Sequence, residues 1–380
     1  MIAFSTESLY SGCHFKVARV SLKYSVEKPD DPHKTVIVKL LYWDKPLLQR
    51  LMLYSKYLIN SPDREVMYLN SYRIESYFYK GQMDFLKGFH TAEIYYNLED
   101  VFNNRFGMVL QDLSKNDDGQ PHGFSFDDAK KILSSLAEFH VHNYQKTLGN
   151  NLIGWNYAGY WTGNKREATK NTVNTSWERV KINFPEFHYH DRMPFLGGLL
   201  YDKLKYMENE FNELSSKKYR TLCHGDFKIS NLFLKREPTS NHPEGKVYVI
   251  DFQWFGQGNG LIDAVYFLYT SLHVDHLSRI HELLSFYYHS LLNLGIKDYP
   301  EELFFHQADV ILADFCVYCI CSKYSNMTAT DIKQYELKVK DGLHLRSIPH
   351  MQLILQKTHS IVHEWSKRPS QAISRKKKKV

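Results

Sequence analysis

Two short apolar runs, Leu232–Leu234 and Val247–Ile250, are separated by a polar stretch that is rich in turn-forming residues. Apolar runs of this length on either side of such a stretch predict a β-hairpin. In an antiparallel hairpin the start of the first strand lies beside the end of the second. The pattern therefore places Asn231 and Asp251 at the same end of the ribbon, with Asp226 on the loop that leads into it.

The hydrophobic pattern of the first part of the chain is mainly that of strands. Phe15–Tyr24 alternates between apolar and polar residues, and together with the residues from Phe4 it predicts a first hairpin. Thr35–Leu41 predicts a further strand that carries Lys39. Phe106–Leu113 predicts a strand that runs into a connector.

Helical periodicity dominates the second part. Ser125 offers a helix cap, and apolar residues follow it at helical spacing as far as His140. Phe195–Leu214 has the same period, and Val274–Trp365 predicts a series of amphipathic helices. Residues 150–192 show little helical period and are predicted to be irregular.

Composition fits a globular protein with a large core. The chain has 380 residues, of which 43% are hydrophobic and 15% aromatic. The aromatic residues could build the core or line an apolar substrate cleft, and the core is the default interpretation. No run of eighteen apolar residues occurs, so no membrane span is expected, and the N-terminus lacks the features of a signal peptide.

Five cysteines in a chain of this length do not form a disulfide framework. Cys316, Cys319 and Cys321 are close in sequence, which suggests either a metal site or a buried helix, and their apolar neighbours favour the helix. His140 and His142 are likewise interpreted as packed or solvated residues and not as metal ligands. These features predict a reducing, cytoplasmic setting.

The net charge of +6 comes mostly from residues 375–379, near the end of the chain. The rest is close to neutral, so an extended basic groove for nucleic acid is not expected. The tail could be a nuclear address, a contact for anionic lipid or other acidic partners, or a solvated end, and we favour the solvated end.

The predicted hairpin carries a set of residues with a recognisable chemistry. The order His224-x-Asp226, then Asn231, a hairpin and Asp251 is that of the catalytic loop and metal site in the protein-kinase fold. In that arrangement Asp226 accepts the proton of the attacking hydroxyl. Asn231 and Asp251 offer the oxygen ligands that suit Mg²⁺, and Lys228 neutralises charge on the transferred phosphoryl group.

Two short motifs of this segment resemble those of a family of small-molecule kinases. His-Gly-Asp, the asparagine five residues later and the sequence Ile250-Asp-Phe-Gln253 resemble the aminoglycoside phosphotransferase and choline kinase superfamily. Within it, the chain is most similar to the CHK-kinase-like, or ecdysteroid-kinase-like, branch. Members of that branch also place an acidic residue at the head of the next helix, where this chain has Asp263. Such a residue can cap the helix or brace the catalytic loop.

The resemblance implies a nucleotide site in the first part of the chain. A buried lysine needs a partner, and Lys39 would pair with the α- and β-phosphates and with a helix glutamate. The alternative is an edge-strand lysine that points to water. Glu75 is the favoured partner, with Glu65 as the competitor, and Gly12 is the single glycine of the predicted phosphate lid.

Relatives use a segment of the form Glu-Asp-Leu as the hinge whose backbone meets adenine. Here Gln111 replaces the glutamate, and Leu113 could pack on the base. On the acceptor side, Trp155, Trp161 and Trp177 are candidates for substrate contact or scaffold residues. Gly256–Gly260 is interpreted as a flexible turn near the acceptor site.

Together these features predict an α+β, two-lobed protein-kinase-like fold. The expected boundaries are a β-rich N-lobe over residues 1–110, a mainly helical C-lobe over 111–372 and a basic tail over 373–380. The expected activity is transfer of the γ-phosphoryl group from ATP, with Mg²⁺, to a hydroxyl of a small molecule. A sterol-like alcohol is favoured, and a choline-like amine stays open.

Two alternatives remain. One is a nucleotide-binding scaffold without transferase activity, suggested by the lid with a single glycine. The other is a protein kinase, which is disfavoured by Gly225, by Gln253 and by the absence of an Ala-Pro-Glu segment after Asp251.

Overall fold

The computed structural model describes most of the chain in twelve segments. These are residues 3–11, 15–23, 35–42, 64–81, 83–100, 105–115, 122–148, 154–162, 172–214, 218–235, 245–338 and 341–367. Gly12 and the basic tail therefore lie outside the described residues. The chain divides into two compact units, residues 1–160 with 214–301 and residues 161–213 with 302–380. The expected lobe boundary at residue 110 stays a prediction.

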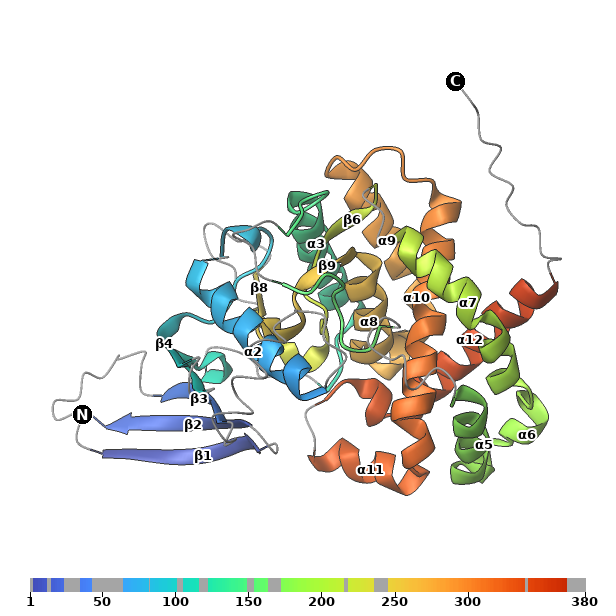
Figure 1. Ribbon diagram of the computed structural model, residues 1–380, viewed down its shortest axis with the longest axis horizontal. Helices are drawn as coiled ribbons and strands as arrows, with labels where there is room; N and C mark the ends of the chain where they lie inside the picture. Colours follow the sequence, from blue (N-terminus) through green and yellow to red (C-terminus); the bar gives the residue numbers. More distant parts are fainter. Residues whose placement is uncertain are drawn as a thin grey trace. The chain divides into compact units, whose positions relative to one another are not determined.

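The first unit contains a five-stranded antiparallel sheet with the order β1-β2-β3-β5-β4 (Figure 1). Its strands are β1 (Ala3–Ser11), β2 (Phe15–Lys23), β3 (Thr35–Tyr42), β4 (Ile94–Asp100) and β5 (Arg105–Gln111). The predicted first hairpin is confirmed as β1 and β2. Because β3 lies in the middle of the sheet, its residues are held between two neighbouring strands.

In its described part, the first unit also contains four α-helices and four short strands. The helices are α2 (Arg64–Gly81), α3 (Phe126–His142), α8 (Leu261–Ser271) and α9 (Ile280–Asn293). The strands are β6 (Arg220–Cys223), β7 (Leu232–Lys235), β8 (Lys246–Val249) and β9 (Gly256–Asn259). Helix α2 packs against β4 and β5, and α3 packs against α9.

Local sequence signals explain several of these boundaries. The Ser125 side chain accepts a hydrogen bond from the backbone N–H of Asp128 at 3.1 Å, which confirms the predicted cap of α3. Every residue of α8 is buried, in agreement with its mostly apolar sequence. The glycine-rich segment interpreted as a flexible turn is instead strand β9, which pairs with β6, so that interpretation was wrong.

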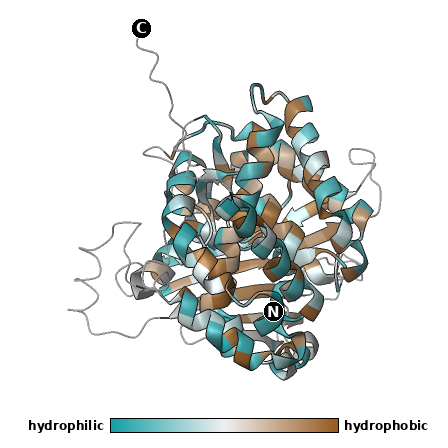
Figure 2. Ribbon diagram, turned by 90° about the vertical axis from the view of Figure 1, so that its right-hand side faces the viewer, coloured by the Kyte–Doolittle hydropathy of each residue, from teal (hydrophilic) through white to brown (hydrophobic). Residues whose placement is uncertain are grey.

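The second unit is helical in its described part. It contains α5 (Val173–Asn183), α6 (Tyr189–Arg192), α7 (Leu196–Leu214), α10 (Glu301–Ser322), α11 (Ala329–Lys338) and α12 (Ile348–Lys367). The expectation of irregular structure over 150–192 was therefore wrong for α5 and α6. Hydrophobic and hydrophilic residues alternate along many of the helical ribbons, which is typical of amphipathic helices (Figure 2).

Helix α10 is the core element of the second unit. Among the described residues, the segment Glu301–Asn326 is long and apolar enough to cross a membrane, but 78% of its most apolar window is buried inside the protein. Such burial is typical of a core helix. Cys316 and Cys319 are fully buried on it and Cys321 is partly buried, which agrees with the predicted buried helix.

Candidate active site

The predicted hairpin is confirmed, and it brings the metal-site candidates together. Strand β7 pairs with β8 in the register Leu232 to Val249. Just beyond this pair, the backbone N–H of Ile250 donates a hydrogen bond to the carbonyl oxygen of Asn231 at 3.0 Å. Asn231 and Asp251 therefore lie at the same end of the ribbon, as the sequence predicted.

Asp226 lies on the loop before the hairpin, and its side chain is held by two neighbours. The Asn231 amide nitrogen donates to one carboxylate oxygen of Asp226 at 3.0 Å and to its backbone oxygen at 2.8 Å. The ammonium group of Lys228 lies 3.3 Å from the other carboxylate oxygen. The two side chains are only 8% and 12% exposed, so little water screens this ion pair.

The ring of His224 bonds to two backbone groups of the same region. Its Nε2 atom lies 2.9 Å from the carbonyl oxygen of Ile250, and its Nδ1 atom accepts from the Asp226 N–H at 3.2 Å. These contacts require a proton on Nε2 and none on Nδ1. Burial lowers the pKa of His224, which favours this neutral form. The His224 ring therefore holds the backbone of Asp226 and the backbone of Ile250 together through these two hydrogen bonds.

The structure explains why glycine stands at position 225. Its backbone has φ +82°, and a Cβ atom there would lie 2.2 Å from the carbonyl oxygen of Trp254 and 2.6 Å from the backbone nitrogen of Gly159. A side chain fits neither the conformation nor the space. The departure from the arginine of protein kinases is therefore required by local packing.

Lys39 bridges two carboxylates that come from distant parts of the chain. Its Nζ atom lies 2.7 Å from Oε2 of Glu75 on α2 and 3.0 Å from Oδ1 of Asp251. Lys39 is buried on the central strand β3, so the alternative of an edge-strand lysine in water was wrong. Glu75 is the observed partner, whereas Glu65 stands in the first turn of α2.

The three charges of this triad perturb each other. Burial raises the pKa of the Glu75 carboxyl to about 7, although the Lys39 ammonium favours its ionised form. Burial also acts to raise the pKa of Asp251, but the charge and hydrogen bond of Lys39 outweigh it and hold that pKa below its usual range. Asp251 has φ +68°, an uncommon conformation for a residue other than glycine and one that occurs at functional sites.

The predicted hinge lies at the end of β5. Gln111 bonds through its backbone N–H and its side-chain oxygen to Glu93, at 2.8 and 3.3 Å, so its side chain turns toward the segment before β4. Leu113 is 6% exposed and begins a short 3₁₀ turn. The structure thus places Gln111 as a strand-end residue and Leu113 as a buried apolar residue.

Sequence reasoning missed Asp112 between them. Its carboxylate lies 2.7 Å from Nε of Arg19 on β2 and accepts a hydrogen bond from the Ser114 hydroxyl at 2.6 Å. Burial acts to raise the pKa of Asp112, but the bonds from Ser114 and Arg19 outweigh it and lower that pKa. These contacts fix the connector to the first hairpin. The sequence does show an acidic residue directly after an apolar strand, which could have marked Asp112 as a candidate. Its partner Arg19 could not be identified, because it is 93 residues away in sequence.

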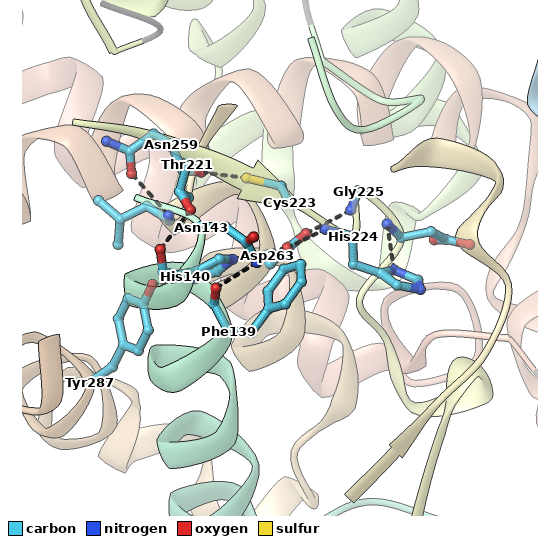
Figure 3. A network of polar contacts seen from close by, with 12 residues as sticks. Phe139, His140, Asn143, Thr221, Cys223, His224, Gly225, Asn259, Asp263 and Tyr287 are labelled. Atoms are coloured by element: carbon cyan, nitrogen blue, oxygen red, sulfur yellow. Dashed lines mark hydrogen bonds and ion pairs between the residues drawn. The ribbon is translucent and has the colours of Figure 1, made fainter. Parts of the chain in front are cut away.

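Asp263 lies between His140 and the backbone of His224 and Gly225, as Figure 3 shows. Its two carboxylate oxygens accept from the backbone N–H groups of His224 and Gly225, at 2.7 and 2.8 Å. The ring of His140 lies 3.2 Å from the same carboxylate, and its other nitrogen lies 2.6 Å from the Tyr287 hydroxyl. His140 is therefore a packed residue, and it belongs to the support of the loop.

Cys223 lies in the same network, close to His140 and Asp263. Its thiol donates to the carbonyl oxygen of Asn259 at 3.3 Å, and burial raises the pKa of this thiol well above its ordinary value. A high pKa disfavours the thiolate that binds metals. The cluster is thus best described as a hydrogen-bonded support and not as a metal centre.

The tryptophans proposed for substrate contact are buried. Trp155 donates its indole N–H to the carbonyl oxygen of Gln253 at 2.8 Å and stacks on Trp254. Trp161 and Trp177 are at most 1% exposed. All three therefore serve as scaffold. Tyr160 approaches the loop that carries Asp226, and its ring centroid lies 5.9 Å from Nζ of Lys228.

Comparison with solved structures finds similar chains of low sequence identity. A choline kinase from Cryptosporidium parvum is 10% identical, with 95% of this chain and 91% of that chain covered and a TM-score of 0.45. An amicoumacin kinase in complex with AMP-PNP and Ca²⁺ is 9% identical, with 94% and 88% covered and a TM-score of 0.47. A spectinomycin phosphotransferase in complex with ADP is 11% identical, with 94% and 91% covered and a TM-score of 0.47.

No curated protein matches the sequence. The model of the ecdysteroid kinase-like family does match, over residues 15–297, which span both the Lys39–Glu75–Asp251 triad and the catalytic loop. The fold is α+β and protein-kinase-like, with Lys39 on the five-stranded sheet and Asp226 on the loop that leads into the β7–β8 hairpin. By this match over most of its length, the chain belongs to the ecdysteroid kinase-like family.

Proposed function

We propose that this protein is an ATP- and Mg²⁺-dependent phosphotransferase that moves the γ-phosphoryl group to a hydroxyl of a small molecule. The observation that carries this proposal is the Lys39 bridge, because it joins the sheet, α2 and the metal-site candidate Asp251 through contacts of 2.7 and 3.0 Å. In phosphoryl transfer by kinases, the lysine–glutamate pair and the metal-site aspartate must be in place together.

Asp226 would act as the base that accepts the proton of the acceptor hydroxyl. Such assistance contributes typically about 10²–10⁴-fold to a rate. Asn231 holds one carboxylate oxygen of Asp226, and Lys228 lies 3.3 Å from the other. Lys228 would stabilise negative charge on the transferred group, next to the base that receives the proton.

The donor set at the end of the hairpin fits a magnesium ion. The amide nitrogen of Asn231 is used by Asp226, so its oxygen is the atom that it can offer to a metal. Asp251 has one carboxylate oxygen on Lys39 and a second oxygen as a further donor, and its lowered pKa keeps it ionised. Asn231 and Asp251 would hold the ion, and its positive charge would offset the negative charge of the nucleotide phosphates.

For the acceptor we propose an alcohol with a large apolar surface, such as a sterol-like molecule. Aromatic rings near Lys228 support this proposal. The ammonium group of Lys228 lies over the ring of Tyr160, and the Tyr160 ring centroid is 5.5 Å from that of Trp254. A flat apolar surface suits such rings. The same rings would also suit a choline-like amine, because aromatic faces attract cations.

The test is ADP release by the wild type and by Asp226→Asn, with MgATP and separate pools of polar and lipid metabolites. We expect release above the variant with one pool, which names the acceptor class, while the variant still binds MgATP. If neither pool gives a difference although both proteins are folded and bind MgATP, the protein is a nucleotide-binding scaffold. Activity retained by the variant would show that Asp226 is not the base.

A further inference from the structure

Both ends of helix α8 contact the loop that carries Asp226. Near the start of the helix, the carboxylate of Asp263 accepts from two backbone N–H groups at the beginning of this loop, which spans residues 224–231. At the last residue of the helix, the Ser271 hydroxyl accepts from the backbone N–H of Ile229 at 2.9 Å. The two helix residues are eight positions apart in sequence, or about 12 Å along the helix axis. One helix therefore holds both halves of the loop, here called the Asp226 loop.

A third contact lies between these two, on the same side of the helix. The rings of Phe227 and Phe267 have a centroid distance of 5.7 Å, and both residues are 0% exposed. Phe267 stands four residues after Asp263 and four residues before Ser271, which is the spacing of neighbours on one face of a helix. Successive parts of the Asp226 loop thus lie along one side of α8.

The Ser271 contact is next to the two side chains that hold Asp226. Ile229 begins a short 3₁₀ turn that ends at Asn231. Lys228, directly before this turn, lies 3.3 Å from one carboxylate oxygen of Asp226, and the Asn231 amide donates to the other at 3.0 Å. The backbone N–H that Ser271 binds is therefore located between the two residues that orient the candidate base.

Ser271 is itself held in place by its neighbours. Its backbone carbonyl oxygen accepts from the N–H of Phe124 at 2.9 Å. Its hydroxyl lies 3.2 Å from the hydroxyl of Thr270, whose own proton is donated to the carbonyl oxygen of Tyr266 at 2.6 Å. The Ser271 hydroxyl can therefore donate to Thr270 while its oxygen keeps a lone pair for the Ile229 N–H. The side chain is thus oriented to accept from the loop.

We propose that Ser271 is a positioning residue whose hydroxyl fixes the turn between Lys228 and Asn231, and thereby the orientation of the Asp226 carboxylate. The catalytic part of this proposal rests on the proposed function, whereas the positioning of the loop does not. Ser271 and Ile229 are 0% and 1% exposed, so water cannot replace the hydroxyl at this contact. A base must lie within hydrogen-bond reach of the proton that it accepts, so a small shift of the turn reduces its efficiency.

The test compares Ser271→Ala with Ser290→Ala. Both substitutions remove one serine hydroxyl from the last turn of a helix in the first unit. The Ser290 hydroxyl donates to the carbonyl oxygen of Phe286 within its own helix α9, at 2.8 Å. It is therefore the matched control for the loss of a helix hydroxyl. Alanine fits both positions, because it is smaller than serine and favours helices.

Hydrogen exchange of the protein without nucleotide tests the positioning independently of any kinase activity. We expect the amides of residues 226–231 to exchange about tenfold faster in Ser271→Ala than in the wild type, because the Ile229 N–H loses its hydroxyl acceptor. The amides of α3 should exchange as in the wild type, and Ser290→Ala should leave the Asp226 loop unchanged. Unchanged exchange of the loop in Ser271→Ala, or an equal gain in α3, would overturn the proposal.

ADP release with MgATP and the acceptor pool that supports turnover tests the catalytic part. We expect the kcat of Ser271→Ala to fall about tenfold. The Kd of MgATP should change less than about twofold, because the contacts of Lys39 with Glu75 and Asp251 are untouched. Equal losses in kcat and in MgATP affinity, or a wild-type kcat, would refute the catalytic part. If the wild type releases no ADP with either pool, the proposed function fails, and hydrogen exchange still decides whether Ser271 positions the loop.

Discussion

Asp263→Asn is the substitution that tests how the catalytic loop is held. Both oxygens of the wild-type carboxylate accept from backbone N–H groups, of His224 at 2.7 Å and of Gly225 at 2.8 Å. Asparagine has the same shape but only one oxygen. Its NH₂ group must therefore face one of these two N–H donors, and no rotation of the side chain avoids this conflict.

The magnitude follows from the burial of the site, where Asp263 is 0% exposed. A hydrogen bond to a charged group contributes about 1.5–3 kcal/mol. A buried donor left without an acceptor costs about 1–3 kcal/mol more. The neutral amide also weakens the contact with the His140 ring, which lies 3.2 Å from the carboxylate. We expect a loss of about 4 kcal/mol in the free energy of unfolding of the first unit, and a lower Tm by about 10 °C.

Thermal unfolding of Asp263→Asn, followed by circular dichroism, measures the effect, and ADP release measures the effect on turnover. Asp275→Asn is the control, since its carboxylate is 74% exposed and its ion pair with His273 contributes little. We expect the control to unfold like the wild type. An Asp263→Asn protein with the Tm and turnover of the wild type would refute the idea that this carboxylate supports the loop.

Three further predictions concern the same loop and the metal site. Gly225→Ala should lower the denaturant midpoint strongly, because its Cβ would meet the Trp254 oxygen at 2.2 Å; an unchanged midpoint would mean that the backbone can relax. Burial lowers the pKa of His224 below its ordinary value of 6.5, so the unfolded chain takes up the proton first as the pH falls. Stability is therefore fully present above about pH 6.5 and declines below it, and denaturant titrations of His224→Gln should show a weaker decline there. Asp251→Asn should abolish the gain in ATP affinity that Mg²⁺ gives in calorimetric titrations, and a retained gain would remove Asp251 from the metal site.

Local pattern was sufficient to predict the hairpin and the strand that carry the candidate site residues. The hairpin needs only two apolar runs and a turn between them, and its antiparallel pairing then places Asn231 next to Asp251. Lys39 could be assigned because a lysine within an apolar strand requires a partner. Glu75 followed from helical spacing and from the resemblance to related kinases, and the 2.7 Å contact agrees with it.

Other residues could not be assigned because their role depends on contacts between distant segments. Arg19 and Asp112 are 93 residues apart, and His140 and Asp263 are 123 residues apart. In each pair, the sequence around one residue contains no information that identifies the other. The prediction of a turn over the glycine-rich segment was wrong for a related reason. Its sequence is typical of a turn, but pairing with the distant strand β6 makes it strand β9.

The sequence by itself thus determined the hairpin, the strand that carries Lys39 and the family, because these depend on pattern and spacing along the chain. The catalytic roles of the loop residues stay predictions. Only the tertiary structure decided how Asp263 supports the loop of His224 and Gly225, and that Phe252, the residue after Asp251, stacks on Phe78 of α2. The reason is physical. A buried carboxylate acquires its role from the donors that packing brings to it, and those of Asp263 include the His140 ring, 123 residues away in the chain.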